Sequence, residues 1–511
     1  METAEMVRTG IAGLDEILMG GIPRKNVILV EGTTGSGKTL LGVEFIYRGI
    51  TEFNEPGIIV LFEISPDKLI RDAATLGWDL ESLQQQKKLQ IVFTSPQVLD
   101  QEVHSPDSLL LETAADMGAH RIFIDGIGLL RPAANAGGPV TSAGVGSYRE
   151  TLQQLIEGLD REHLTTMLSH ELLGNPESLA TSEGAVSLAD TVIRLSRTLK
   201  QRRIQRSLEI VKSRGQDYVH GEHTLEIHDG KGLEVFRRVQ VPLRNQDQIT
   251  STIRRSLIGS QEMDGMIGGG VFDGSTTIVV GPSGLGKTIL GLQILMEGAM
   301  QQKRRGLLIS LDEHTPQIVR NAESVGIKLK QQIESGGIHV LFQSPQEINI
   351  DAHFSSIVKT IEENDIGRMV IDGMTSYSTA LGDQSMYRDF FHALVAFSKN
   401  RLMTTFFNYE NPEFLGISSF MPEYPVTSIV DNIILMNLVE ISSTLRRCLT
   451  VVKARGTKHE YDSREYVIGD GGITLLPAQG EIAEALPLSR YASILSRAPS
   501  RLPAARPPAG T

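Results

Sequence analysis

Two glycine-rich stretches of the chain have the composition of a phosphate-binding loop. Each contains the pattern Gly-x-x-x-x-Gly-Lys-Thr, at residues 32–39 and 281–288. Each follows a β-rich apolar run and precedes an apolar-periodic helix pattern. At such a strand-to-helix turn, backbone N–H groups and the positive end of the helix dipole hold an anion. The two stretches therefore predict two sites for ATP with Mg²⁺.

The residues expected to bind ATP are those of the two loops and the residue after each. They are Gly32, Thr33, Thr34, Gly35, Ser36, Gly37, Lys38, Thr39 and Leu40, and then Gly281, Pro282, Ser283, Gly284, Leu285, Gly286, Lys287, Thr288 and Ile289. We expect each lysine to reach the β- and γ-phosphates and each threonine hydroxyl to ligate Mg²⁺. A glycine-rich helix start can occur by accident, but the complete pattern occurs twice in the right setting.

Acidic residues stand at two further strand ends in each half of the chain. Asp125 and Asp372 each end an apolar strand, where a carboxylate could orient Mg²⁺ through water. Glu63 and the pair Asp312 and Glu313 end the second strand of each half. A carboxylate there can polarise an attacking water or a substrate hydroxyl toward the γ-phosphate. The alternative interpretation is that these acids only cap the helices that follow.

A lysine and an arginine alternate near the end of each half, at Lys212 and Arg214 and at Lys453 and Arg455. On a strand, residues two apart face the same way, so each pair offers two cations on one face. Such a pair suits the triphosphate of a neighbouring subunit, where it would neutralise charge that develops in the transition state. This interpretation requires an oligomer, and a head-to-tail contact that closes gives a ring. An exposed basic strand is the alternative.

The spacing of these motifs shows that the chain contains an internal duplication of one unit. Glu63 lies 25 residues past Lys38 (63 − 38), and Asp312 lies 25 past Lys287 (312 − 287). Short apolar strands alternate with amphipathic helices in both halves, which predicts mainly parallel sheets flanked by helices. The predicted fold class is therefore α/β, with two tandem RecA-like P-loop domains. We place them at 1–241 and 257–487, with a linker at 242–256 and a disordered tail at 488–511 that is rich in Arg, Pro and Ala.

Composition limits the cellular setting. The formal net charge of −12 argues against non-specific binding to nucleic acid, which depends on Lys and Arg contacts to phosphate. The single cysteine, Cys448, excludes an intrachain disulfide and fits a reducing compartment. No stretch approaches the roughly 20 apolar residues that span a bilayer. We therefore expect a cytoplasmic protein with no membrane partner.

The motifs, their order and the duplication resemble the KaiC family, the two-lobed RecA-related ATPases typified by the cyanobacterial circadian clock protein. The resemblance extends from about residue 9 to residue 476 and includes the lobe-entry sequence Gly-Leu-Asp-Glu at 13–16. It implies a hexameric double ring with ATP and Mg²⁺ between subunits. It also implies a slow ATPase in the first lobe, and an autokinase and autophosphatase in the second.

The resemblance also assigns roles to single acids. Glu63 matches the first of two catalytic glutamates in the first lobe, and Ile64 replaces the second. Asp312 and Glu313 match the paired glutamates of the kinase lobe, so the first of that pair is one methylene shorter here.

Hydroxyl and basic residues of the second half also match family positions. Thr427 and Ser428 match the adjacent phosphoacceptors, with the residue types in reversed order. The first half has only Val186 and Ser187 at that place. Positions that approach the neighbour's nucleotide are matched by Arg447, Lys453, Arg455 and His459.

We therefore expect ATP hydrolysis at subunit interfaces of a ring and autophosphorylation on Ser or Thr in the second domain, in timing or signalling control. One alternative is a RecA-like DNA-dependent ATPase. Another is a nucleotide-gated scaffold without kinase activity, which would dock a partner such as a KaiB-like protein. Past Leu476 the sequence departs from the clock protein, so a working circadian oscillator is not implied.

Overall fold

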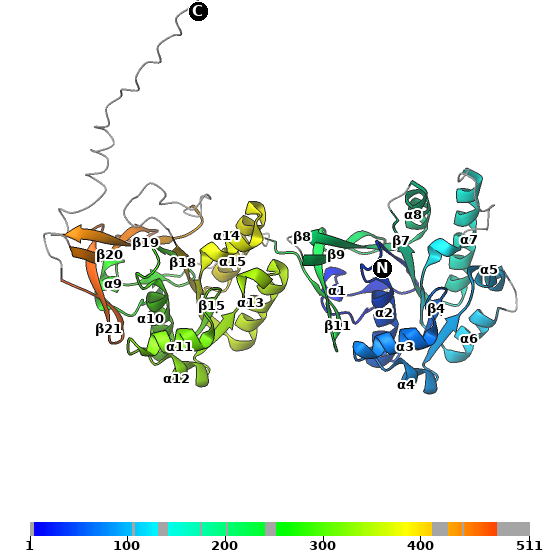
Figure 1. The fold of residues 1–511 in the computed structure, drawn as a ribbon, viewed down its shortest axis with the longest axis horizontal. Coiled ribbons are helices and arrows are strands. Elements are labelled where there is room, and N and C mark those ends of the chain that lie inside the picture. Colours follow the sequence, from blue (N-terminus) through cyan, green and yellow to red (C-terminus); the bar gives the residue numbers. More distant parts are fainter. Residues whose placement is uncertain are drawn as a thin grey trace, which may run out of the picture. The chain divides into compact units, whose positions relative to one another are not determined.

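The computed structural model describes residues 5–104, 108–130, 142–173, 176–200, 203–240, 252–410, 428–441 and 444–477. Most of the predicted linker, the predicted tail and Thr427 lie outside the described residues. The chain divides into two compact units, unit 1 at residues 1–238 and unit 2 at residues 239–511 (Figure 1). Each unit is an α/β structure built on one nine-stranded sheet, which confirms the predicted fold class.

The sheet of unit 1 is parallel in its larger part and antiparallel at one edge. Its strand order is β11-β10-β9-β8-β3-β7-β6-β4-β5. The parallel strands are β3 (Val27–Gly32), β4 (Gly57–Leu61), β5 (Leu89–Phe93), β6 (Arg121–Ile124), β7 (Thr165–Glu171) and β8 (Thr191–Lys200). The antiparallel strands are β9 (Arg203–Ser213), β10 (Glu222–His228) and β11 (Gly232–Phe236).

Helices pack against both faces of this sheet. They are α1 (Leu14–Ile17), α2 (Lys38–Phe53), α3 (Pro66–Thr75), α4 (Leu80–Gln85), α5 (Pro96–His104), α6 (Leu109–Met117), η1 (Ile127–Leu129), α7 (Ser142–Arg161) and α8 (Pro176–Leu188). Two short strands, β1 (Met6–Val7) and β2 (Ile22–Pro23), form a separate two-stranded sheet. Ile28 and Val30 of β3 belong to one hydrophobic cluster, and Val27 and Leu29 belong to another. The central strand is therefore buried on both faces, which explains its continuous apolar run.

Unit 2 repeats this arrangement strand for strand. Its order is β16-β15-β17-β18-β14-β19-β20-β21-β22. The strands are β14 (Thr276–Gly281), β15 (Arg305–Ser310), β16 (Ile338–Phe342), β17 (Ile366–Asp372), β18 (Thr404–Glu410), β19 (Asn432–Ile441), β20 (Thr444–Ala454), β21 (Arg464–Gly469) and β22 (Gly472–Leu475), with a short pair β12 (Arg255–Ser256) and β13 (Val271–Phe272). The helices are α9 (Gln261–Met266), α10 (Lys287–Met300), α11 (Thr315–Glu323), α12 (Leu329–Glu334), η3 (Pro345–Glu347), α13 (Ile350–Asn364), α14 (Met374–Leu381) and α15 (Gln384–Asn400).

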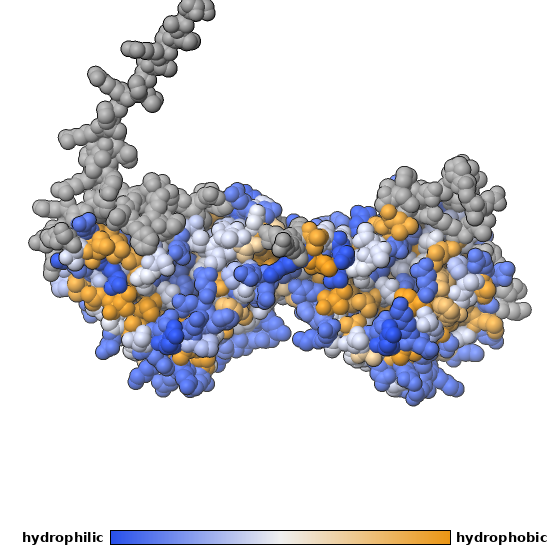
Figure 2. Space-filling model, viewed as in Figure 1, coloured by the Kyte–Doolittle hydropathy of each residue, from blue (hydrophilic) through white to orange (hydrophobic). Residues whose placement is uncertain are grey.

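The helices that cover each sheet are hydrophilic on the side that faces water. On the face drawn in Figure 2, hydrophilic residues cover most of α3, α4, α11 and α12. Within the described ranges, no helix is both long enough and apolar enough to cross a membrane.

The P-loop helices of the two units differ in one buried polar side chain. Glu44 of α2 is fully buried and accepts a hydrogen bond of 2.7 Å from the Leu233 N–H at β11. Gln293 of α10 stands at the same distance from its lysine (44 − 38 and 293 − 287) and accepts 2.8 Å from the Ile473 N–H at β22. Burial raises the pKa of Glu44 to about 7, against the opposing effect of the Leu233 N–H and Arg48.

We expect Glu44→Gln to remove a pH-dependent loss of stability from unit 1. A raised carboxyl pKa means that the folded state prefers the protonated acid, so stability falls as the pH rises from about 4.5 through about 7. At pH 8 the charged acid costs at most about 3 kcal/mol, and the amide avoids that cost. Urea unfolding followed by fluorescence of Trp78, the single tryptophan, measures this because Trp78 is buried in unit 1.

The matched control is Glu52→Gln, because Glu52 also pairs with Arg48 on α2 but is partly exposed. That variant should keep the wild-type pH dependence. A Glu44→Gln protein whose stability still falls between pH 5 and pH 7 as the wild type does would contradict the prediction.

Candidate functional site

Both glycine-rich stretches form the predicted turn between a strand and a helix. In unit 1 the loop joins β3 to α2, and in unit 2 it joins β14 to α10. Gly37 and Gly286 are the helix N-caps, with φ of 111° and 92°, a backbone conformation that favours glycine. The first glycine of each loop is required for a different reason. A Cβ on Gly32 or Gly281 would lie 2.3 Å from a carbonyl oxygen of the neighbouring strand.

The two loop lysines fold back over their own loops. Lys38 Nζ donates to the Thr33 carbonyl at 3.0 Å, and Lys287 Nζ donates to the carbonyls of Gly281 and Pro282 at 2.8 Å each. Burial lowers the pKa of both lysines, while nearby carboxylates act in the opposite direction. Each ammonium group therefore lies inside the loop that a phosphate would occupy.

The structure brings together the two predicted Mg²⁺ ligands in each unit. Thr39 Oγ1 donates to Asp125 Oδ2 at 2.9 Å, and Thr288 Oγ1 donates to Asp372 Oδ2 at 2.6 Å. Hydroxyl and carboxylate oxygens are the donors that Mg²⁺ prefers, and such sites usually complete the shell with water and phosphate. The donor set fits the ion that the sequence predicts.

A second polar residue holds the other oxygen of each aspartate predicted to bind Mg²⁺, and the sequence reasoning missed both. Ser169 Oγ donates to Asp125 Oδ1 at 2.5 Å, and Asn408 Nδ2 donates to Asp372 Oδ1 at 2.9 Å. Burial raises the pKa of Asp372, and its hydrogen bonds from Thr288 and Asn408 counteract this. The available signal was a polar residue directly after two apolar ones, Met-Leu-Ser in β7 and Phe-Phe-Asn in β18.

The candidate catalytic acids follow the ends of β4 and β15. Glu63 is exposed to solvent two residues past β4, and Asp312 is exposed two residues past β15. A Cβ on Gly373, the residue after Asp372, would lie 2.6 Å from Asp312 Oδ2. Glu313 instead accepts a hydrogen bond of 3.1 Å from Asn321 of α11. Of the predicted pair, Asp312 is therefore the acid that lies beside the predicted metal ligands.

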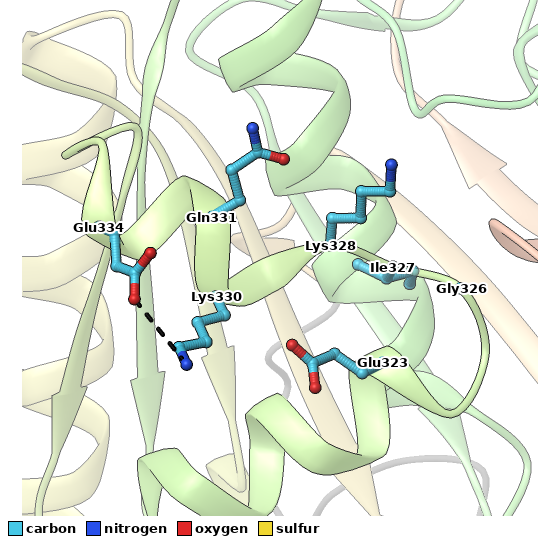
Figure 3. Close-up of a pocket in the computed structure, with 7 residues that line it drawn as sticks. All are labelled: Glu323, Gly326, Ile327, Lys328, Lys330, Gln331 and Glu334. Carbon is cyan, nitrogen blue, oxygen red and sulfur yellow. Dashed lines mark ion pairs between the residues drawn. The ribbon is translucent and has the colours of Figure 1, made fainter.

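A hollow in unit 2 lies away from these groups. It has a volume of about 470 Å³ and is lined from α11, α12 and the turn between them (Figure 3). Helix α12 leads into the start of β16, whereas the P-loop follows the end of the parallel strand β14. The hollow therefore lies toward the end of the sheet where the parallel strands begin, opposite the P-loop. Its lining includes no predicted site residue.

The paired cations also lie at the opposite end of the sheet from the P-loop of their own unit. They lie where the parallel strands begin, and the P-loop lies where they end. The Arg214 N–H donates to the Asp190 carbonyl, and Asp190 Oδ2 accepts from the Val27 N–H at the start of β3. In unit 2, Asp431 connects Arg455 to the Thr276 N–H at the start of β14 in the same way. The P-loops follow the ends of β3 and β14. Each pair is therefore remote from its own phosphate loop.

Within their own unit the cations bind the backbone that precedes β8 or β19. Lys212 Nζ donates to the Val186 carbonyl and Lys453 Nζ to the Val430 carbonyl, both at 2.8 Å. Arg455 Nη2 donates to the Ser428 carbonyl, also at 2.8 Å. Ser428, one of the two predicted phosphoacceptors, is exposed to solvent, and Thr427 lies outside the described residues.

The structure separates Arg447 from the other basic residues predicted in unit 2. Arg447 pairs with Leu438 in β19, toward the end of the sheet that carries the P-loop. Lys453 lies near the other end of β20. Six residues of extended strand place them roughly 20 Å apart. The equivalent of Arg447 in unit 1 is Arg206, whose Nε donates to the Gly35 carbonyl of the P-loop at 3.4 Å. The sequence reasoning missed Arg206, although it stands six residues before Lys212 as Arg447 does before Lys453.

His459 follows β20 and packs its ring against Tyr461, with the ring centroids 4.4 Å apart. Unit 1 has the same pair in reversed order, Tyr218 and His220, with centroids 4.5 Å apart. The position is therefore aromatic in both units, at the same spacing from the lysine.

Comparison with known proteins agrees with this geometry. The family described as "ATPase: KaiC" matches residues 7–240 and 257–480, which are the two P-loop units. The chain is 32% identical over 475 residues to the circadian clock oscillator protein KaiC of Thermostichus vulcanus, covering 92% of this chain and 88% of that protein. It is 31% identical to the KaiC proteins of Picosynechococcus sp. (98% and 93% covered) and Synechococcus elongatus (91% and 88% covered). The chain therefore belongs to the KaiC family of ATPases.

Proposed function

We propose that both units bind ATP with Mg²⁺ and hydrolyse it at sites that a neighbouring copy of the chain completes. The copies would form a ring, of the hexameric double-ring type that the resemblance implies. The observation that carries this proposal is the position of the cation pairs. Lys212 with Arg214, and Lys453 with Arg455, lie at the end of the sheet opposite their own P-loop, so they can serve a triphosphate only at a P-loop outside their own unit, such as that of a neighbouring copy.

The residues of each site divide the reaction between them. The backbone of the loop and Lys38 or Lys287 would hold the β- and γ-phosphates, and the threonine–aspartate pair would hold Mg²⁺. The bound Mg²⁺ would offset negative charge on the phosphate oxygens. Glu63 would orient water in unit 1, and Asp312 would accept a proton in unit 2.

In unit 2 we propose that the attacking group is a side-chain hydroxyl of Thr427 or Ser428. Its oxygen would form a bond to the γ-phosphorus of the ATP bound by a neighbouring copy, while the bond from that phosphorus to the β–γ bridging oxygen breaks. ADP would leave, and the hydroxyl proton would pass to Asp312 of the neighbouring copy. Exposure of Ser428 and the acid beside the metal ligands support this step.

We propose a role in timing or signalling control, which is supported by the relatives, since they are named as circadian clock oscillator proteins. A KaiB-like protein is the partner that we propose, from the resemblance of the chain to the KaiC family. A DNA-dependent ATPase is the less favoured function, because a net charge of −12 repels a polyanion.

Incubation of the purified chain with Mg²⁺ and γ-labelled ATP tests the proposal. We expect free phosphate and a labelled protein, with the label mapped by mass spectrometry to Thr427 or Ser428. Lys287→Ala should remove the label, and Lys38→Ala should keep it.

Free phosphate without labelled protein would exclude the kinase step and favour the nucleotide-gated scaffold. Absence of both products would contradict the proposal as a whole. A mobility shift of single-stranded DNA at low salt would favour the DNA-dependent ATPase instead.

A further inference from the structure

The carboxylate of Asp312 is held by a hydroxyl that has no counterpart in unit 1. Ser376 Oγ, on helix α14, donates a hydrogen bond of 2.7 Å to Asp312 Oδ1. Ser376 stands four residues past the metal aspartate (376 − 372), and the residue at that place in unit 1 is Leu129 (129 − 125). Leucine offers no donor to Glu63. Of the two acids, the shorter one therefore has a hydroxyl partner at this position.

The other oxygen of Asp312 lies over a residue that has no side chain. A Cβ on Gly373 would be 2.6 Å from Asp312 Oδ2, so any larger residue would displace the acid. Gly373 has φ of 98° and forms the N-cap of α14. Asp312 is thus held from one side by Ser376 and extends over the residue next to Asp372.

Helix α14 is itself fixed on two sides, so Ser376 stands on a rigid element. Tyr377 is fully buried and shares a hydrogen bond of 2.6 Å with His353 of α13. Thr375 Oγ1 accepts a hydrogen bond of 3.0 Å from the Glu410 N–H at the end of β18. A donor on such an element can hold an exposed carboxylate in one rotamer, which water alone does not do.

We infer that Ser376 is a positioning residue for the reaction of unit 2, holding the Asp312 carboxylate beside the metal site. The inference rests on the function proposed above for this unit. An aspartate one methylene shorter than glutamate reaches less far, and a fixed rotamer places its oxygen for proton transfer. The Ser376 hydroxyl donates to Asp312, so we expect its effect on the reaction to pass through that acid.

The test measures phosphate release and self-labelling in the full chain with Lys38→Ala, which confines hydrolysis to unit 2. We expect Ser376→Ala to lower kcat roughly tenfold, with the KM for ATP changed less than twofold. Ser376→Thr, which keeps the hydroxyl, should restore most of the rate. In an Asp312→Asn protein, Ser376→Ala should have no further effect, because the acid that it positions has gone.

Ser378→Ala is the control, since Ser378 Oγ donates only to the Thr375 carbonyl on the same helix. It should keep the wild-type kcat. Equal kcat for Ser376→Ala and its parent would overturn the inference and leave the proposed function standing. A tenfold loss that persists in the Asp312→Asn background would also overturn it, because the serine would then act without the acid. A parent that neither releases phosphate nor labels itself would overturn the proposed function, and this inference with it.

Discussion

Replacing Asp372 by asparagine should reduce phosphate release from unit 2 about 10²- to 10³-fold, the size of effect seen when one electrostatic contact is removed from a transition-state site. The carboxylate accepts from Thr288 on one oxygen and from Asn408 on the other. An amide in its place turns an NH₂ group toward one of these two donors. It also removes the negative charge that favours Mg²⁺.

The measurement is steady-state hydrolysis with Lys38→Ala, at several Mg²⁺ concentrations. We expect the requirement for Mg²⁺ to rise and the maximal rate to fall. Asp383→Asn is the control, because Asp383 is the N-cap of α15 and accepts from the Ser385 and Met386 N–H groups instead. An Asp372→Asn protein with an unchanged requirement for Mg²⁺ and an unchanged maximal rate would show that this acid has no role in binding the ion.

The parts of the site that could be predicted are those that a short stretch of sequence encodes. The P-loop needs glycine at fixed positions because of positive φ and of the close strand beside Gly32 and Gly281. The aspartates at the ends of β6 and β17 were recognisable because an apolar strand ended in an acid. The same order of motifs in both halves then predicted the duplicated fold.

The residues that were missed are supplied by other strands and helices. Asn408 is the register partner of Asp372 in the pairing of β17 with β18. The sequence around Asn408 does not predict this partner. Ser376 reaches Asp312 from a helix 64 residues further along the chain. Such contacts depend on strand order, which the motifs do not encode. For the same reason the raised pKa of Glu44 depends on burial under β11, which periodicity alone does not show.

The position of the cation pairs leads to the strongest test of a shared site. Two proteins are prepared with Lys38→Ala, which silences unit 1. One also carries Lys287→Ala in the P-loop of unit 2, and the other carries Lys453→Met with Arg455→Met. Each alone should lose at least about 10²-fold of its unit 2 activity, because each lacks one part of every site.

Mixed rings should recover activity that neither protein has by itself. Where an intact P-loop of the second protein meets intact cations of the first, the site is whole. Random mixing in equal amounts makes about a quarter of all interfaces of this kind. If instead each chain served its own nucleotide, every site would lack a part at every mixing ratio, and no activity would return.

Two controls separate complementation from other causes of recovery. Mixing Lys287→Ala with Thr288→Ala should give no recovery, because both changes damage the P-loop and no interface is whole. Native mass spectrometry of the mixed sample shows whether the two proteins share rings. Shared rings without recovered hydrolysis would mean that Lys453 and Arg455, at the end of the sheet opposite their own P-loop, do not act on the neighbour's phosphates. Recovery near a quarter of the parent rate would instead place each active site between two chains, since no contact within one chain can restore it.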